Sequence, residues 1–140
     1  MSGDFIDTNI FIYLFDETDD RKRAIAEQLI QQALETRNAC ISYQVIQETL
    51  NVVTRKLPSP MSTENARRFL EQILIPLWQT MPSPALYQQG LELQARYGLS
   101  FYDALIVAAA LESGCTRLYT EDLQHGQQVG ELLIENPFRK

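Results

Sequence analysis

Four acidic side chains fall at places in the sequence from which they could act together. Two follow short apolar segments, one lies in the first turn of an apolar helix and one lies on the flank of another helix: Asp7, Glu48, Asp103 and Asp122. Carboxylates held close together repel one another, most strongly where water is excluded. A hard divalent cation relieves that repulsion, and ligation by oxygen atoms alone selects Mg²⁺ or Mn²⁺ over Zn²⁺. The sequence therefore predicts a magnesium or manganese site, provided that the fold brings the four acids together.

Asp7 has the most unusual surroundings of the four, because apolar residues lie on both sides of it, at 5–6 and 10–12. Charged side chains are rarely fully buried unless they are paired or bound to a metal. A short buried strand would deliver Asp7 to the crevice at the carboxyl end of a sheet, where open α/β sheets bind ligands. Thr8 and Asn9 could hold Asp7 and a metal-bound water by hydrogen bonds, or they could cap the short helix that follows.

Glu48 and Asp103 each have a second interpretation. Glu48 falls beside the apolar arc of its helix, at the rim of the buried face, but solvated glutamates are common at such flanks. Ser100 and Asp103 have the spacing of a capping box, in which Asp103 would reach back to the start of its own helix. Both interpretations remain open at the level of sequence.

The elements that must position these acids alternate along the chain. Periodicity predicts helices at 21–36, 43–56, 62–74 and 84–97, a buried helix that includes 104–111, and short helical turns at 9–14. The expected capping residues are Ser42, Ser62 or Thr63, and Ser83 at helix starts and Gly98 at a helix end. Short strands are expected before Asp7 and at 39–41, 75–81, 117–120 and 132–134, with 75–81 near a sheet edge. Strands that alternate with helices favour a mostly parallel sheet between helical layers. We therefore expect one α/β domain over 1–140, a three-layer α/β/α sandwich around a five-stranded sheet.

Composition excludes several other classes of protein. The 140 residues carry a net charge of −6 without a basic stripe, so phosphate binding would have to depend on a metal ion. His125 is the only histidine and is expected in a surface turn, which rules out a paired-histidine ribonuclease mechanism. Cys40 and Cys115 are isolated in the sequence and suggest neither a zinc site nor a disulfide framework. We expect a reduced, cytoplasmic protein without a membrane span or signal peptide.

The acids and their neighbours together resemble one protein family. Asp7-Thr8-Asn9 follows the first strand, Glu48 lies in the third helical segment, Ser100-Phe101-Tyr102-Asp103-Ala104 opens an alanine-rich helix, and Thr120-Glu121-Asp122 follows a later strand. This order is similar to that of the PIN-domain ribonucleases and covers nearly the whole chain. In size the chain resembles the VapC-type toxins of bacterial toxin–antitoxin pairs.

The resemblance implies metal-dependent cleavage of RNA by a PIN-like fold. Mg²⁺ or Mn²⁺ would be held mainly by Asp7, Asp103 and Asp122, and Glu48 would orient the metal or its bound water. Thr8, Asn9, Ser100 and Thr120 would support these acids. The implied partners are the RNA substrate and a cognate antitoxin protein, and exposed candidates such as Trp78 suggest a homodimer.

Two alternatives accompany this resemblance. Many members of the family have an aspartate–phenylalanine pair shortly after the fourth acid, where this sequence has Leu123-Gln124-His125. Glu121 is therefore an alternative to Asp122 as the fourth acid. The net negative charge also allows a non-catalytic PIN-like scaffold that binds RNA or protein.

Overall fold

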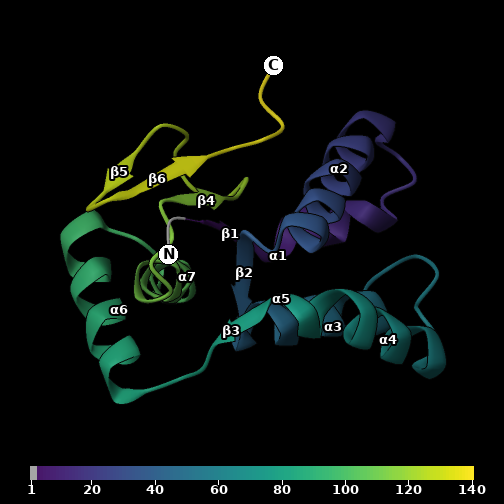
Figure 1. Ribbon diagram of the computed structural model, residues 1–140, viewed down its shortest axis with the longest axis horizontal. Helices are drawn as coiled ribbons and strands as arrows, with labels where there is room; N and C mark the ends of the chain where they lie inside the picture. The colour runs from purple at the N-terminus through teal and green to yellow at the C-terminus, as the bar shows by residue number, and fades with distance from the viewer. Residues whose placement is uncertain (1–2) are drawn as a thin grey trace.

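A six-stranded sheet lies at the centre of the computed structural model, which describes residues 3–140 (Figure 1). The strand order is β3-β2-β1-β4-β6-β5. All neighbouring strands are parallel except β5, which pairs antiparallel with β6. The strands are β1 Asp4–Ile6, β2 Ala39–Ser42, β3 Trp78–Thr80, β4 Arg117–Tyr119, β5 Gln128–Val129 and β6 Leu132–Glu135. The first two residues of the predicted 1–140 domain lie outside the described part of the chain.

Helices cover both faces of this sheet, as predicted. Figure 1 shows α6 and α7 on one side and α1, α2, α3, α4 and α5 on the other. Their bounds are α1 Thr8–Ile12, α2 Asp20–Thr36, α3 Tyr43–Arg55, α4 Thr63–Phe69, α5 Ile75–Leu77, α6 Pro84–Tyr97 and α7 Phe101–Glu112, with a 3₁₀ turn η1 at Tyr13–Phe15 and a π-helical segment η2 at Leu70–Leu74. α7 is buried from Ala104 to Ala110, because its apolar residues face both the sheet and α6.

The register of the central strands decides which residues meet at the edge of the sheet. β1 is paired on both sides, with Phe5 opposite Cys40 of β2 and Ile6 opposite Tyr119 of β4. Asp7 and Thr120 follow Ile6 and Tyr119 in the chain, so they leave the sheet side by side. The first strand therefore delivers Asp7 to the carboxyl edge, as its flanking apolar residues predicted.

Two predictions about the strands were wrong in detail. The sheet has six strands because Gly130, with φ 60°, allows a tight turn that folds the two-residue β5 back on β6. A strand of two residues is too short to produce a recognisable sequence pattern. Residues 75–77 are helical, so only 78–80 form the predicted edge strand. The segment before Pro76 is π-helical and therefore wider than an α-helix. It accommodates the proline ring, which would clash with the preceding turn of an α-helix.

The helix ends follow the predicted capping residues with one exception. The hydroxyls of Ser62, Ser83 and Ser100 accept backbone N–H groups of the helices that they precede. Gly98 ends α6 in the left-handed region, with φ 69°. Ser42 stands at the predicted N-cap of α3, but its hydroxyl is buried and forms no capping hydrogen bond. No helix formed by residues 3–140 has the length and apolar character that a membrane crossing requires.

The two cysteines, isolated in the sequence, meet in the core. Their sulfur atoms are 3.4 Å apart, and both side chains are buried free thiols. Cys40 lies on β2 and Cys115 precedes β4, and β1 lies between these two strands. The contact joins residues 75 positions apart. It follows from strand order, which the spacing of the cysteines could not reveal.

Candidate active site

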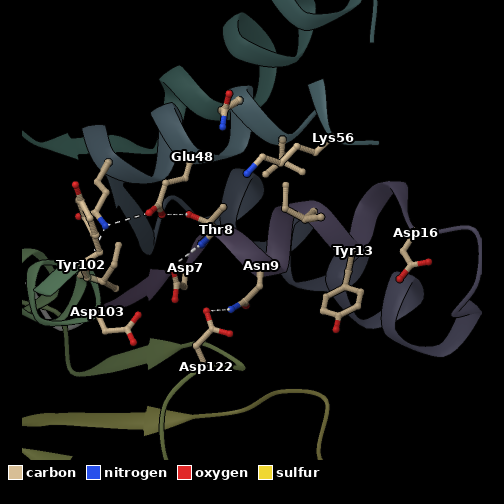
Figure 2. Close-up of a pocket in the computed structure, with 15 residues that line it drawn as sticks. Asp7, Thr8, Asn9, Tyr13, Asp16, Glu48, Lys56, Tyr102, Asp103 and Asp122 are labelled. Atoms are coloured by element: carbon tan, nitrogen blue, oxygen red, sulfur yellow. Dashed lines mark hydrogen bonds between the residues drawn. The ribbon is translucent and has the colours of Figure 1, made fainter. Parts of the chain in front are cut away.

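A pocket of about 700 Å³ opens at the carboxyl edge of β1, and all four predicted acids line it (Figure 2). Figure 2 shows the carboxylates of Asp7, Asp103 and Asp122 turned toward the same space, while Glu48 approaches from α3. Thr8 and Asn9 also line the pocket. Ser100 and Thr120 do not line the pocket, but each forms a hydrogen bond with a residue that does: Ser100 with Asp103 and Thr120 with Asp7. The fold thus brings together acids that are spread over more than a hundred positions of the sequence.

Asp7 is a buried carboxylate at the base of this pocket, with only 4% of its surface exposed. It is the N-cap of α1 and accepts hydrogen bonds from the Thr8 N–H at 2.7 Å and from the Thr120 hydroxyl at 2.8 Å. The pKa of Asp7 is raised from 3.8 to about 7, chiefly because the carboxylate is buried; the nearby Asp122 and Glu48 contribute to this rise, and the two hydrogen bonds oppose it. A positive ion beside Asp7 would offset this desolvation.

Glu48 points into the pocket and is held there by two neighbours. The Thr8 hydroxyl donates to one Glu48 oxygen at 2.8 Å, and the Gln44 amide lies 3.3 Å from the other. Gln44 also donates to the carbonyl oxygen of Tyr102 at 3.2 Å, which links α3 to the first turn of α7. Glu48 is therefore not a solvated flank residue. Thr8 links the two acids, since its N–H donates to Asp7 and its hydroxyl donates to Glu48.

Asp103 forms only half of the capping box. Its N–H donates to the Ser100 hydroxyl at 3.3 Å, so Ser100 caps α7 as predicted. The Asp103 carboxylate, however, lines the pocket. Ser100 supports this acid by setting where the helix begins.

Asp122 is held by the residues at the start of α1 and the end of β4. The Asn9 side-chain amide nitrogen donates to the Asp122 carboxylate at 3.0 Å, and the Asn9 side-chain oxygen Oδ1 accepts the Glu121 N–H at 3.3 Å. The Thr120 hydroxyl, which donates to Asp7, also accepts the Asp122 N–H at 3.1 Å. Thr120 is fully buried, so this one hydroxyl couples the placement of two acids.

Glu121 has different partners and does not line the pocket. The Tyr13 hydroxyl and the Lys22 ammonium each lie 2.5 Å from a Glu121 carboxylate oxygen. Lys22 also donates to the Tyr13 hydroxyl at 3.1 Å and lies 4.8 Å from the centre of its ring. Glu121 is thus neutralised by Lys22, whereas Asp122 faces the other acids. Of the two candidates for the fourth acid, the geometry favours Asp122.

The donor set of the pocket has the chemistry that suits a hard divalent cation. None of the four acids forms an ion pair within residues 3–140, and every candidate ligand atom is an oxygen. The side chains do not lie within ligating distance of one common point: no group of three or more His, Cys, Asp or Glu in this part of the chain has the geometry of a metal-binding cluster.

His125 is exposed, accepts the Asn136 N–H, and does not line the pocket.

Comparison with known proteins identifies the family. A model of the PIN domain matches residues 5–128, and the chain belongs to the PIN domain family. Among curated proteins, a search found no match to the chain.

Solved structures share this fold at low sequence identity. A toxin–antitoxin complex from Klebsiella pneumoniae contains a chain that is 21% identical, with a TM-score of 0.65 over 96% of this chain and 98% of that one. FitAcB from Neisseria gonorrhoeae gives 21% identity and a TM-score of 0.65 over 98% and 99%. VapC20 from Mycobacterium tuberculosis, described as a Sarcin-Ricin loop cleaving toxin, gives 20% and 0.61 over 86% and 90%.

Proposed function

We propose that this chain is a Mg²⁺- or Mn²⁺-dependent endoribonuclease that acts in the cytoplasm as the toxin of a toxin–antitoxin pair. The observation that carries the proposal is Asp7, a buried acid beside three other carboxylates at the end of parallel strands, none of which is paired with a cation of residues 3–140. The PIN-domain match supports a nuclease role. The toxin–antitoxin and VapC structures that share the fold support the role of a toxin.

The four acids of the pocket would have different roles in the reaction. Asp7, Asp103 and Asp122 would hold the ion, which when bound supplies positive charge to an attacking water and to the phosphate. Thr120 keeps Asp7 and Asp122 in register through its single hydroxyl. Glu48, whose oxygens accept hydrogen bonds from Thr8 and Gln44, would orient the ion or its bound water. The bound ion also supplies the positive charge that an acidic chain needs to bind a phosphodiester.

The proposed partners follow from the charge and the exposed surface. A cognate antitoxin would place a basic side chain among the acids, and its inhibition would weaken at high salt because charge attraction is screened. Trp78 and Met81, at 40% and 57% exposed, offer an apolar surface beside the edge strand β3 for a second copy of the chain.

The test of the proposal compares wild-type protein with Asp7→Asn. After treatment with a chelator, wild-type protein should cleave single-stranded RNA only when Mg²⁺ or Mn²⁺ is restored, and Asp7→Asn should not cleave under either condition. Undiminished cleavage by Asp7→Asn with Mg²⁺ present would contradict the proposal.

The alternative is a non-catalytic scaffold, and the net charge of −6 is the observation that favours it. Calorimetric titration with Mn²⁺ separates the two functions. A nuclease should bind the ion through its acids and release a proton, since the ion favours the ionised form of Asp7. Absence of both Mn²⁺ binding and RNA cleavage would favour the scaffold.

A further inference from the structure

Besides the acids and their hydrogen-bond partners, the pocket wall contains a well-exposed aromatic ring and a cation. Tyr102 and Lys56 both line the pocket and lie on opposite sides of Glu48 (Figure 2). Among the pocket-lining residues within 3–140, Lys56 is the one cation beside five acids. Because the chain is acidic, general attraction to phosphates cannot supply the affinity for a nucleic acid. Binding must therefore come from local contacts at this pocket.

Tyr102 presents an exposed aromatic ring next to the proposed ion site. Its side chain is 64% exposed, although the adjacent Asp103 turns its carboxylate into the pocket. The backbone is held in place because Gln44 donates to the Tyr102 carbonyl oxygen. The Phe101 ring packs edge-on against it, with centroids 5.4 Å apart. The ring is thus positioned at the rim and leaves surface free to stack on a nucleotide base.

Lys56 supplies a free positive charge on the other side of Glu48. It follows the last turn of α3, the helix that also contributes Glu48 and Val52 to the pocket. Lys56 forms no ion pair with the described residues, whereas Lys22, another nearby lysine, is paired with Glu121. In Figure 2 its side chain extends from the end of α3 back toward Glu48. An ammonium in this position suits a backbone phosphate of the bound strand.

We propose that the pocket binds single-stranded RNA across these two contacts, with a base stacked on Tyr102, a phosphate bound by Lys56 and the scissile phosphate at the acids. A base can offer its face to a side chain only when it is unstacked from its neighbours, so the site should prefer single strands to duplexes. The inference rests on the proposed function, because it takes RNA as the substrate. It adds two contacts that are independent of the metal.

The experiment measures the binding of a labelled single-stranded RNA to Asp7→Asn protein, which serves as a non-cleaving parent, from about 50 to 200 mM salt. Adding Tyr102→Ala should weaken binding about 5- to 100-fold at every salt concentration, because stacking does not depend on salt. Tyr102→Phe keeps the ring and should bind like the parent. Adding Lys56→Gln should weaken binding most at low salt and reduce the slope of log affinity against log salt by about 0.7.

Two variants provide matched controls outside the pocket. Tyr87→Ala removes another exposed tyrosine, and Arg55→Gln removes the positive charge next to Lys56 in the chain. Both should bind like the parent, and a duplex of the same sequence should bind more weakly than the single strand.

Unchanged affinity in Tyr102→Ala, an unchanged salt slope in Lys56→Gln, or equal binding of duplex and single strand would overturn the inference. Failure of the proposed function is seen separately. Wild-type protein that does not cleave RNA with Mg²⁺, while the two binding signatures are present, would refute the nuclease but keep the binding path. Wild-type cleavage without those signatures would refute the binding path alone.

Discussion

The substitution Asp7→Asn should stabilise the metal-free protein at alkaline pH, and the gain should disappear in acid. The pKa of Asp7 rises from 3.8 to about 7 on folding, so the folded state holds this proton more tightly than the unfolded state does. Below the pKa of 3.8 that Asp7 has in the unfolded chain, the carboxyl is protonated in both states and its burial does not destabilise the fold. As the pH rises toward 7, burial of the ionised carboxylate destabilises the fold increasingly, and above pH of about 7 the full destabilisation is present. Asparagine has no charge to desolvate at any of these pH values.

The magnitude follows from the pKa shift and from the hydrogen bonds of Asp7. The rise in the pKa of Asp7 from 3.8 to about 7 corresponds to about 4 kcal/mol of unfolding free energy. The ionised carboxylate accepts two hydrogen bonds, from the Thr8 N–H and the Thr120 hydroxyl. Asparagine has one acceptor oxygen, and losing one of these bonds costs about 1 kcal/mol. The expected net gain for Asp7→Asn is therefore about 3 kcal/mol at pH of about 8, or about 10 °C in Tm for a chain of this length.

The measurement is urea unfolding of both proteins with a chelator present, from about pH 4 to pH 8. Glu64→Gln is the control for removal of an acid outside the pocket: Glu64 is 71% exposed and pairs with Arg68, so this variant should not be more stable than wild type at pH of about 8. Mg²⁺ or Mn²⁺ should then stabilise wild-type protein more than Asp7→Asn. A stability difference between Asp7→Asn and wild type that is the same at every pH, or a less stable variant at pH of about 8, would refute the reasoning.

Two further predictions concern residues whose partners were found only in the structure. Asp122→Asn should abolish RNA cleavage, whereas Glu121→Gln should only reduce it, because Glu121 is paired with Lys22 outside the pocket. Equal losses of activity in a cleavage assay would show that the assignment of Asp122 as the fourth acid is wrong. The thiols of Cys40 and Cys115 should react with a thiol reagent only as fast as the protein unfolds, since both are buried, and rapid modification of the native protein would contradict their placement in the core.

Local pattern was sufficient for much of the fold and for the candidate acids. An apolar strand followed directly by an acid predicts where Asp7 leaves the sheet, because strand burial and parallel pairing depend on a few consecutive residues. The capping role of Ser100 and the end of α6 at Gly98 follow from equally local rules. Pro76 was less informative, because it does not reveal that the segment before it is π-helical. That conformation depends on how the surrounding turns pack.

The partners of the acids were decided by the tertiary structure. The family resemblance named Thr120 as a support of the acids, but the sequence does not show that its hydroxyl bonds Asp7, which lies 113 positions away. The choice between Glu121 and Asp122 likewise depends on Lys22, which lies on a helix far away in the sequence. Periodicity reports which face of an element is buried, but strand order and register determine which distant side chains meet there. The sequence by itself therefore singled out four candidate acids that line one pocket, and the parallel pairing of β1 with β4 decided how two of them are held.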